Sequence, residues 1–124
     1  MKKSVSTAAA LIAVAAMAGC AYMSPSPVKA SDGVLVGANG MTLYTFDRDM
    51  AGSGKSMCND ACATNWPPLL ASKAPRGDYS LVTRDDGKMQ VAYQGKPLYY
   101  WSKDTKPGDK TGDGVNQLWR TARP

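Results

Sequence analysis

The sequence predicts an all-β fold: a small antiparallel β domain made of two similar hairpin-containing units with long loops. Short runs of β-branched and aromatic residues are separated by Gly, Asp and Asn, which is typical of strands joined by turns. No segment after residue 31 sustains a helical period. A segment of fourteen residues also recurs 55 positions further along the chain. The third observation is the one that predicts two units.

The recurring segment aligns V-G-A-N-G-M-T-L-Y-T-F-D-R-D (36–49) with V-A-Y-Q-G-K-P-L-Y-Y-W-S-K-D (91–104). Val, Gly, Leu, Tyr and Asp are identical between the copies, and Phe46 aligns with Trp101. Such self-similarity indicates two copies of one supersecondary unit. The predicted boundaries are about 34–70 and 89–122 for the units, within a single domain over 32–124.

Each copy predicts a β-hairpin, with an apolar strand, a turn at Asn39-Gly40 or Gln94-Gly95, and a second strand. Between the copies, the runs 79–83 and 89–93 flank Asp86-Gly87 and predict a further hairpin. The remaining expected elements are a short helical turn over 59–64 and a final strand over 118–121.

Alternation along the second strand of each hairpin sorts its side chains onto two faces. One face should carry Leu43, Thr45, Leu98 and Tyr100, and the other Tyr44, Phe46, Tyr99 and Trp101. Trp66 and Trp119 follow the two copies at similar distances, so we expect them to be equivalent core anchors. Tyr93 and Tyr100 are expected to be partly exposed.

Both copies contain tyrosine, an aromatic residue and aspartate at one spacing, as Tyr44, Phe46, Asp49 and as Tyr99, Trp101, Asp104. A buried tyrosine contributes a large apolar area, but its hydroxyl needs a partner. The aspartate follows the strand end, where a carboxylate can accept backbone N–H groups of the next turn. We therefore expect each motif to fix a hairpin to its following loop. The alternative is a pair of aromatic clefts that bind a ligand.

The first twenty residues read as an export signal, with Lys2 and Lys3 before an apolar run over 8–18. Met17-Ala18-Gly19-Cys20 resembles a bacterial lipobox, which implies removal of residues 1–19 and a lipid on Cys20. Residues 20–31, rich in Pro and Ser, are expected to form a flexible tether. The resemblance implies a lipid-anchored envelope protein, at the outer membrane and facing the periplasm if the source is Gram-negative.

Composition argues against several classes of function. The chain has no histidine and no glutamate, which excludes His-based catalysis. Removal of Lys2 and Lys3 with the signal leaves a net charge of about +3, and the basic residues are not clustered with aromatic ones. We expect no enzymatic activity, no cofactor and no nucleic-acid partner.

Cys58 and Cys62 are the pair that remains once Cys20 is lipidated, and an exported pair predicts a local disulfide. The alternative is a Cu(I) or thiol redox site, because thiolate and thioether ligands select Cu(I) and Met57 precedes Cys58. Met41 and Met50 lie upstream of this pair. A calcium loop at Asp104, Asp109 and Asp113 is a weaker alternative, because lysines share that stretch.

The sequence resembles a family of secreted bacterial repeat lipoproteins with a Yx(FWY)xxD motif. The resemblance rests on the two motif copies and on two further segments, C-x-x-x-C-x-x-x-W-P-P and K-x-G-D-x-x-G-D-G-x-x-x-x-W. The resemblance covers residues 32–122 and supports the fold, the export and the lipidation. It implies no activity, because the family is known as a repeat of unknown function. The sequence thus predicts a non-enzymatic binding or structural role, with the Cu(I) or redox protein as the alternative.

Overall fold

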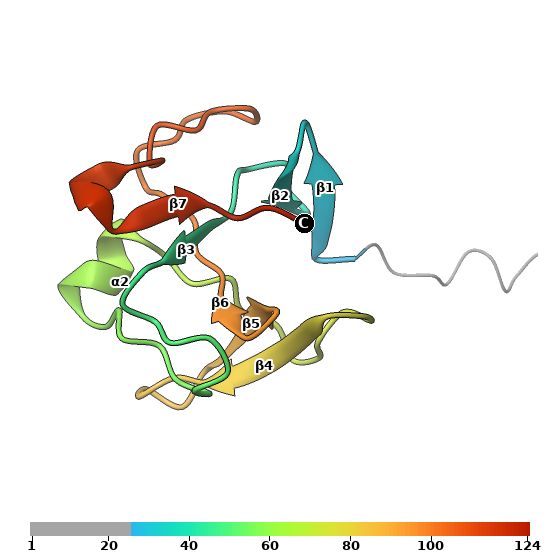
Figure 1. The fold of residues 1–124 in the computed structure, drawn as a ribbon, viewed down its shortest axis with the longest axis vertical. Coiled ribbons are helices and arrows are strands. Elements are labelled where there is room, and N and C mark those ends of the chain that lie inside the picture. Colours follow the sequence, from blue (N-terminus) through green and yellow to red (C-terminus); the bar gives the residue numbers. More distant parts are fainter. Residues whose placement is uncertain (1–25) are drawn as a thin grey trace, which may run out of the picture.

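Seven short strands build the part of the chain that the computed structural model describes, residues 26–124 (Figure 1). The elements are β1 (Val28–Ser31), β2 (Val34–Gly37), β3 (Tyr44–Phe46), α2 (Ala61–Asn65), β4 (Tyr79–Thr83), β5 (Met89–Tyr93), β6 (Lys96–Pro97), η1 (Val115–Gln117) and β7 (Trp119–Thr121). The helical turn predicted over 59–64 is α2. Neither helix in residues 26–124 is long and apolar enough to cross a membrane.

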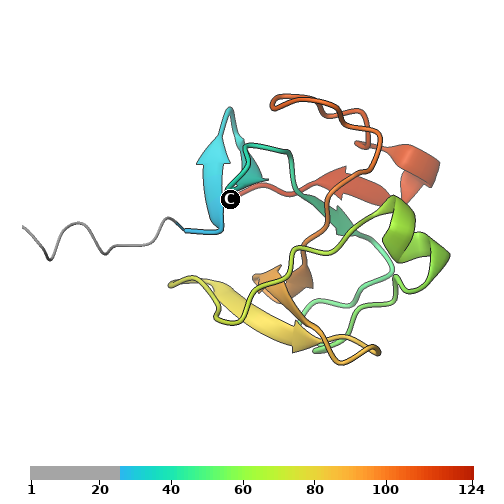
Figure 2. The same ribbon diagram turned by 180° about the vertical axis from the view of Figure 1, so that it is seen from behind.

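The strands form three small antiparallel sheets, ordered β1-β2, β3-β7 and β4-β5-β6, and this confirms the predicted all-β class. β3 and β7 lie side by side although more than seventy residues separate them, with Tyr44 opposite Thr121 and Phe46 opposite Trp119 (Figures 1 and 2). The chain therefore closes on itself, because its last strand pairs with the motif strand of the first unit.

The first strand begins earlier than the sequence suggested. The tether was expected to reach residue 31, but β1 starts at Val28, whose side chain is buried in the core. β1 and β2 form a hairpin through Asp32 and Gly33, which both have positive φ. Asp-Gly is a strong signal for such a two-residue turn, and the predicted domain start at Asp32 overlooked it. Residues 1–25, with the export signal and Cys20, lie outside the described residues.

The predicted hairpin over 79–93 is confirmed, with β4 and β5 in register from Tyr79 opposite Tyr93 to Thr83 opposite Met89. The Gln94-Gly95 turn is also confirmed, and it joins β5 to β6 with both residues at positive φ. The first unit is looser. Its turn closes by a bond from Gly40 N–H to the Gly37 carbonyl, and only an isolated bridge continues the pairing. β3 then leaves β2 to pair with β7.

The two units meet at their motif tyrosines. Tyr44 N–H donates to the Tyr99 carbonyl at 2.8 Å, and Tyr99 N–H donates to the Tyr44 carbonyl at 2.9 Å. Because this bond pair joins equivalent residues of the two copies, an approximate two-fold axis passes between them. Equivalent side chains of the two units are thus brought together at one place.

Two buried clusters lie on opposite faces of these strands, as the alternation predicted. The aliphatic cluster contains Leu43 and Leu98, with Tyr100 packed against it. The aromatic cluster contains the motif tyrosines and their aromatic partners, with the disulfide. Its members are Tyr44, Phe46, Cys58, Trp66, Tyr99 and Trp119, with Cys62, Trp101, Val115 and Leu118 partly buried at its edge.

The Gly95 turn supplies a test of how the second hairpin is held. A Cβ at Gly95 would lie 2.5 Å from the Gly52 backbone nitrogen, whereas one at Gly87, also at positive φ, would meet nothing within 4 Å. Gly87→Ala should cost about 1–2 kcal/mol through backbone strain alone. Gly95→Ala should cost about 1–3 kcal/mol more, because the backbone of the first unit must move. Urea unfolding measures both values, and equal losses would contradict the close contact.

Candidate functional site

The motif tyrosines bond to the motif aspartates of the opposite unit. Tyr44 Oη donates to Asp104 Oδ2 at 2.6 Å, and Tyr99 Oη donates to Asp49 Oδ2 at 2.5 Å. These distances are typical of a hydroxyl that donates to a carboxylate. We call these two bonds the crossed tyrosine–aspartate pairs. They join the units through side chains at the point where the backbone bonds already join them.

The second oxygen of each carboxylate holds the loop that follows its own strand. Asp49 Oδ1 accepts the Met57 N–H at 2.7 Å. Asp104 Oδ1 accepts the Thr111 N–H at 3.0 Å and the Thr111 hydroxyl at 2.6 Å. The sequence predicted this loop contact, but it did not predict the crossed tyrosines. Each motif copy has one tyrosine donor and one aspartate acceptor. The sequence therefore does not distinguish a tyrosine–aspartate bond within one unit from a bond between the two units.

A buried arginine, Arg84, supports one of the two pairs and was not singled out in the sequence. Its Nη1 donates to Ser56 Oγ at 2.9 Å, and Ser56 Oγ lies 2.6 Å from Tyr99 Oη. Arg84 is 4% exposed, and its Nη2 also donates to the Cys58 carbonyl at 2.7 Å. The buried positive charge is therefore linked to Asp49 through two hydroxyl groups. Sequence alone places Arg84 beside a polar hairpin turn, which suggests exposure.

The other pair has no such charge among its direct partners. Tyr44 Oη accepts the Gly112 N–H at 3.1 Å, which leaves the hydroxyl proton directed to Asp104. Burial and the bond to Asp104 raise the pKa of Tyr44. Burial and the bond to Asp49 likewise raise the pKa of Tyr99. Burial raises the pKa of Asp49, although bonds from Tyr99 and Met57 and the Arg84 charge oppose that change.

The aromatic side chains of both units form one continuous stack. Ring centroids are 3.9 Å apart for Trp101 and Trp66, 3.7 Å for Trp66 and Trp119, and 4.2 Å for Trp119 and Phe46. Trp66 and Trp119 are almost fully buried, which confirms both as core anchors. Tyr93 and Tyr100 are partly exposed, also as predicted.

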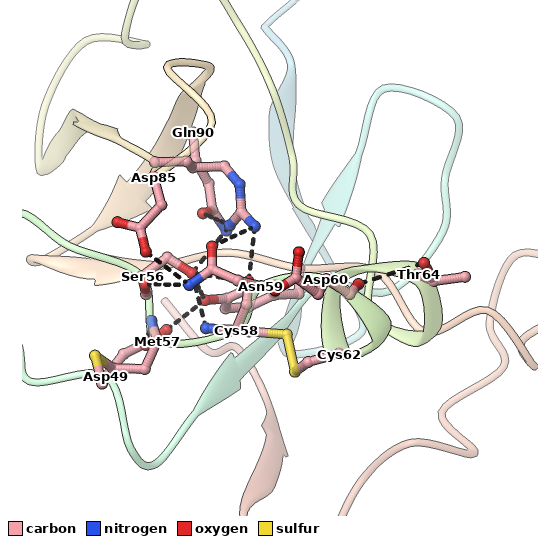
Figure 3. Close-up of a disulfide and its surroundings, with 12 residues drawn as sticks. Asp49, Ser56, Met57, Cys58, Asn59, Asp60, Cys62, Thr64, Asp85 and Gln90 are labelled. Carbon is pink, nitrogen blue, oxygen red and sulfur yellow. Dashed lines mark hydrogen bonds between the residues drawn. A yellow bond between two sulfur atoms is a disulfide. The ribbon is translucent and has the colours of Figure 1, made fainter.

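Cys58 and Cys62 form the predicted disulfide, which ties the loop before α2 to the first turn of that helix (Figure 3). Cys58 is fully buried against the aromatic cluster. Met57 is 63% exposed, and Met50 is exposed as well. Both thiols are used in the bond, so the Cu(I) or thiol redox alternative with Met57, Cys58 and Cys62 would first require its reduction.

The three aspartates of the weaker calcium alternative have separate partners. Asp104 holds Tyr44 and Thr111, Asp109 bonds to the Lys106 ammonium at 2.9 Å, and Asp113 accepts the Thr121 N–H at 3.1 Å. The Lys106 bond holds the pKa of Asp109 well below its usual range. Within residues 26–124, no three acidic or cysteine side chains are grouped in a way that would hold a metal ion.

Several hollows open on the surface of residues 26–124. One of about 260 Å³ is lined by Trp101, Tyr100, Pro67 and polar side chains of the loop before β3. A larger one of about 420 Å³ lies beside β7. Its charged lining consists of Lys96, Asp113, Arg120 and Arg123. These surfaces offer non-covalent contacts. Trp101 and Asp104 are the motif residues that line the smaller hollow, whereas the other motif side chains, Tyr44, Phe46, Asp49 and Tyr99, are buried.

The crossed arrangement predicts which side chains are energetically coupled. Tyr44→Phe and Asp104→Asn should each cost about 1–3 kcal/mol, because each leaves a buried polar partner without its bond. Combined, they should show a coupling energy of about 0.5–3 kcal/mol in urea unfolding. The control combines Tyr44→Phe with Asp49→Asn. These two side chains share no hydrogen bond, so their losses of stability should be nearly additive. Stronger coupling in the control than in the crossed pair would contradict this arrangement.

The raised tyrosine pKa values predict instability in alkali. The folded chain keeps the Tyr44 and Tyr99 protons at a pH where the unfolded chain has lost them, so the folded state binds more protons. Stability should therefore fall as pH rises above about 10, by about 1.4 kcal/mol per pH unit for each tyrosine. Urea unfolding over a pH series measures this slope. Tyr44→Phe should reduce it, and an unchanged slope would show that Tyr44 contributes nothing to it.

Comparison with known proteins agrees with the two-unit fold. Residues 26–70 and 80–123 each match the family described as a secreted repeat of unknown function. No curated protein and no solved structure matches the chain. The first match begins at residue 26, in agreement with the early start of β1. Since the two matches together cover most of the chain, this protein belongs to that family of secreted repeats and carries two copies of the repeat.

Proposed function

We propose that this protein is a lipid-anchored component of the cell envelope whose β domain has a non-enzymatic binding or structural role. The observation that carries the proposal is the crossed tyrosine–aspartate pairs. The side chains that define the repeat bond to one another and to adjacent loops, so they serve to hold the fold. A ligand or partner protein would then meet the surface of the domain, where Trp101 and Asp104 are the motif residues that line a hollow.

The sequence before the domain supports the anchor. Met17-Ala18-Gly19-Cys20 resembles a lipobox, and the family is secreted. The eight residue steps from Cys20 to Val28, where β1 begins, can span at most about 28 Å. A lipid on Cys20 would therefore hold the folded domain close to the membrane surface. In a Gram-negative cell, Ala21 after the lipidated cysteine favours the outer membrane.

Composition and geometry support a role without catalysis. The chain has neither histidine nor glutamate, so aspartate would have to supply any carboxylate for acid–base work. The buried aspartates, Asp49 and Asp104, are already occupied by tyrosine hydroxyls and backbone N–H groups. Surface recognition is the use that this arrangement favours.

The anchor is tested by expressing the full chain and Cys20→Ala in a bacterial host. The full chain should sediment with membranes, and its intact mass should correspond to residues 20–124 plus a lipid. The variant should lack the lipid and leave the membrane fraction after washing. An unlipidated wild-type chain would overturn the anchor, and turnover of a substrate by the purified protein would overturn the non-enzymatic role.

A further inference from the structure

The three tryptophans of the chain form a single stack that runs from the surface into the core. Trp101 is partly exposed and lines the 260 Å³ hollow, while Trp66 and Trp119 are buried. Neighbouring rings are in van der Waals contact, with centroids 3.9 and 3.7 Å apart. Burial of apolar area explains tryptophan in a core, but it does not require all three rings to stack face to face from the surface inwards.

Each motif tyrosine touches this stack by its edge. Tyr44 meets Trp66 with ring centroids 5.4 Å apart, and Tyr99 meets Trp119 at 5.1 Å. Each hydroxyl donates to a buried carboxylate at the same time. Indole and phenol are the most easily oxidised ring side chains here. A phenol that loses an electron also loses its proton, so a carboxylate at hydrogen-bond distance makes that oxidation easier.

The two tyrosines differ in their surroundings. The Arg84 guanidinium lies one hydroxyl group away from Tyr99, through Ser56. A buried positive charge opposes both the removal of an electron from Tyr99 and the transfer of a proton to Asp49. Tyr44 accepts only a neutral backbone N–H, from Gly112. It also contacts Trp66, the ring next to the partly exposed Trp101. Tyr44 is thus the easier of the two to oxidise.

We propose that Trp101, Trp66 and Tyr44 form a one-electron relay that takes oxidising equivalents from oxygen-centred radicals at the surface and holds them on Tyr44. This activity goes beyond the binding or structural role proposed above. A peroxyl radical would take one electron from Trp101 and one proton from water, and become a hydroperoxide with release of hydroxide.

The electron lost by Trp101 is replaced from Trp66, and that of Trp66 from Tyr44. The Tyr44 hydroxyl proton then passes to Asp104 Oδ2, across the existing 2.6 Å bond. A tyrosine and a carboxylate become a neutral tyrosyl radical and a neutral carboxylic acid. One electron leaves the protein, and the hydroxyl proton stays inside it. Both indoles return to their original state.

The relay is tested with a photogenerated ruthenium(III) tris-bipyridyl complex as the one-electron oxidant, applied to the purified protein. Transient absorption should show a tryptophan radical that decays as a tyrosyl radical forms. The second step should be slower in heavy water, because a proton moves with the electron. Absence of a tyrosyl radical, or one that forms without a tryptophan precursor, would overturn the relay.

Variants assign the path. Tyr44→Phe should lose the late tyrosyl signal, whereas Tyr99→Phe should keep most of it. Trp101→Phe should lose the early tryptophan signal, and Asp104→Asn should slow the tyrosyl step. The matched controls are Tyr79→Phe and Tyr93→Phe, which remove partly buried tyrosines that pack on each other and outside the stack. A control that loses as much signal as Tyr44→Phe would overturn the assignment.

A measurement on the wild-type protein avoids dependence on variants that fold poorly. After limited oxidation by the photogenerated ruthenium(III) complex, peptide mass spectrometry should locate the stable oxidation products mainly at Trp101 and Tyr44. Products mainly at the exposed Met50 and Met57 with no tyrosine product would overturn the relay, because the surface thioethers would then compete successfully for the oxidant.

Discussion

The structure depends on two hydrogen bonds from tyrosine to aspartate that cross between the repeat units. Burying a phenol hydroxyl or a carboxylate without a hydrogen-bond partner costs folding free energy. Here each group is the partner of the other, so neither is buried unpaired. Since the donor comes from one unit and the acceptor from the other, neither unit satisfies its own motif. The pairs therefore join the two repeats into one folding unit, together with the backbone bonds between Tyr44 and Tyr99.

The loops are built outwards from these pairs. The second carboxylate oxygen of Asp49 accepts the Met57 N–H and fixes the loop one residue before the disulfide. The second oxygen of Asp104 accepts the Thr111 N–H and fixes the loop one residue before Gly112. A Cβ at Gly112 would lie only 2.8 Å from the Trp66 ring, so glycine there lets the loop rest on the tryptophan stack. The bonds thus place both the disulfide loop and the glycine loop against the aromatic cluster.

Approximate symmetry gives the two pairs equal geometry, but their electrostatics differ. Arg84, from the hairpin between the units, reaches Ser56 beside Tyr99, and Gly112 N–H takes the corresponding place beside Tyr44. The two motifs are thus equivalent as structural joints and unequal as chemical environments. The connecting segment contacts only one of the two repeats. The two pairs can therefore differ in chemistry although the motif residues are of the same kind in both.

The sequence by itself determined the strand class, the hairpins at Asp86-Gly87 and Gln94-Gly95, the two faces of the motif strands and the local disulfide, because turn residues, alternation and short spacing are encoded locally. Tertiary structure alone decided that Tyr44 bonds to Asp104, that β3 pairs with β7, that Arg84 is buried and that the three tryptophans form one stack. These contacts join residues far apart in the chain. Equal motif copies offer identical donors and acceptors, and only the packing of one unit on the other selects between them.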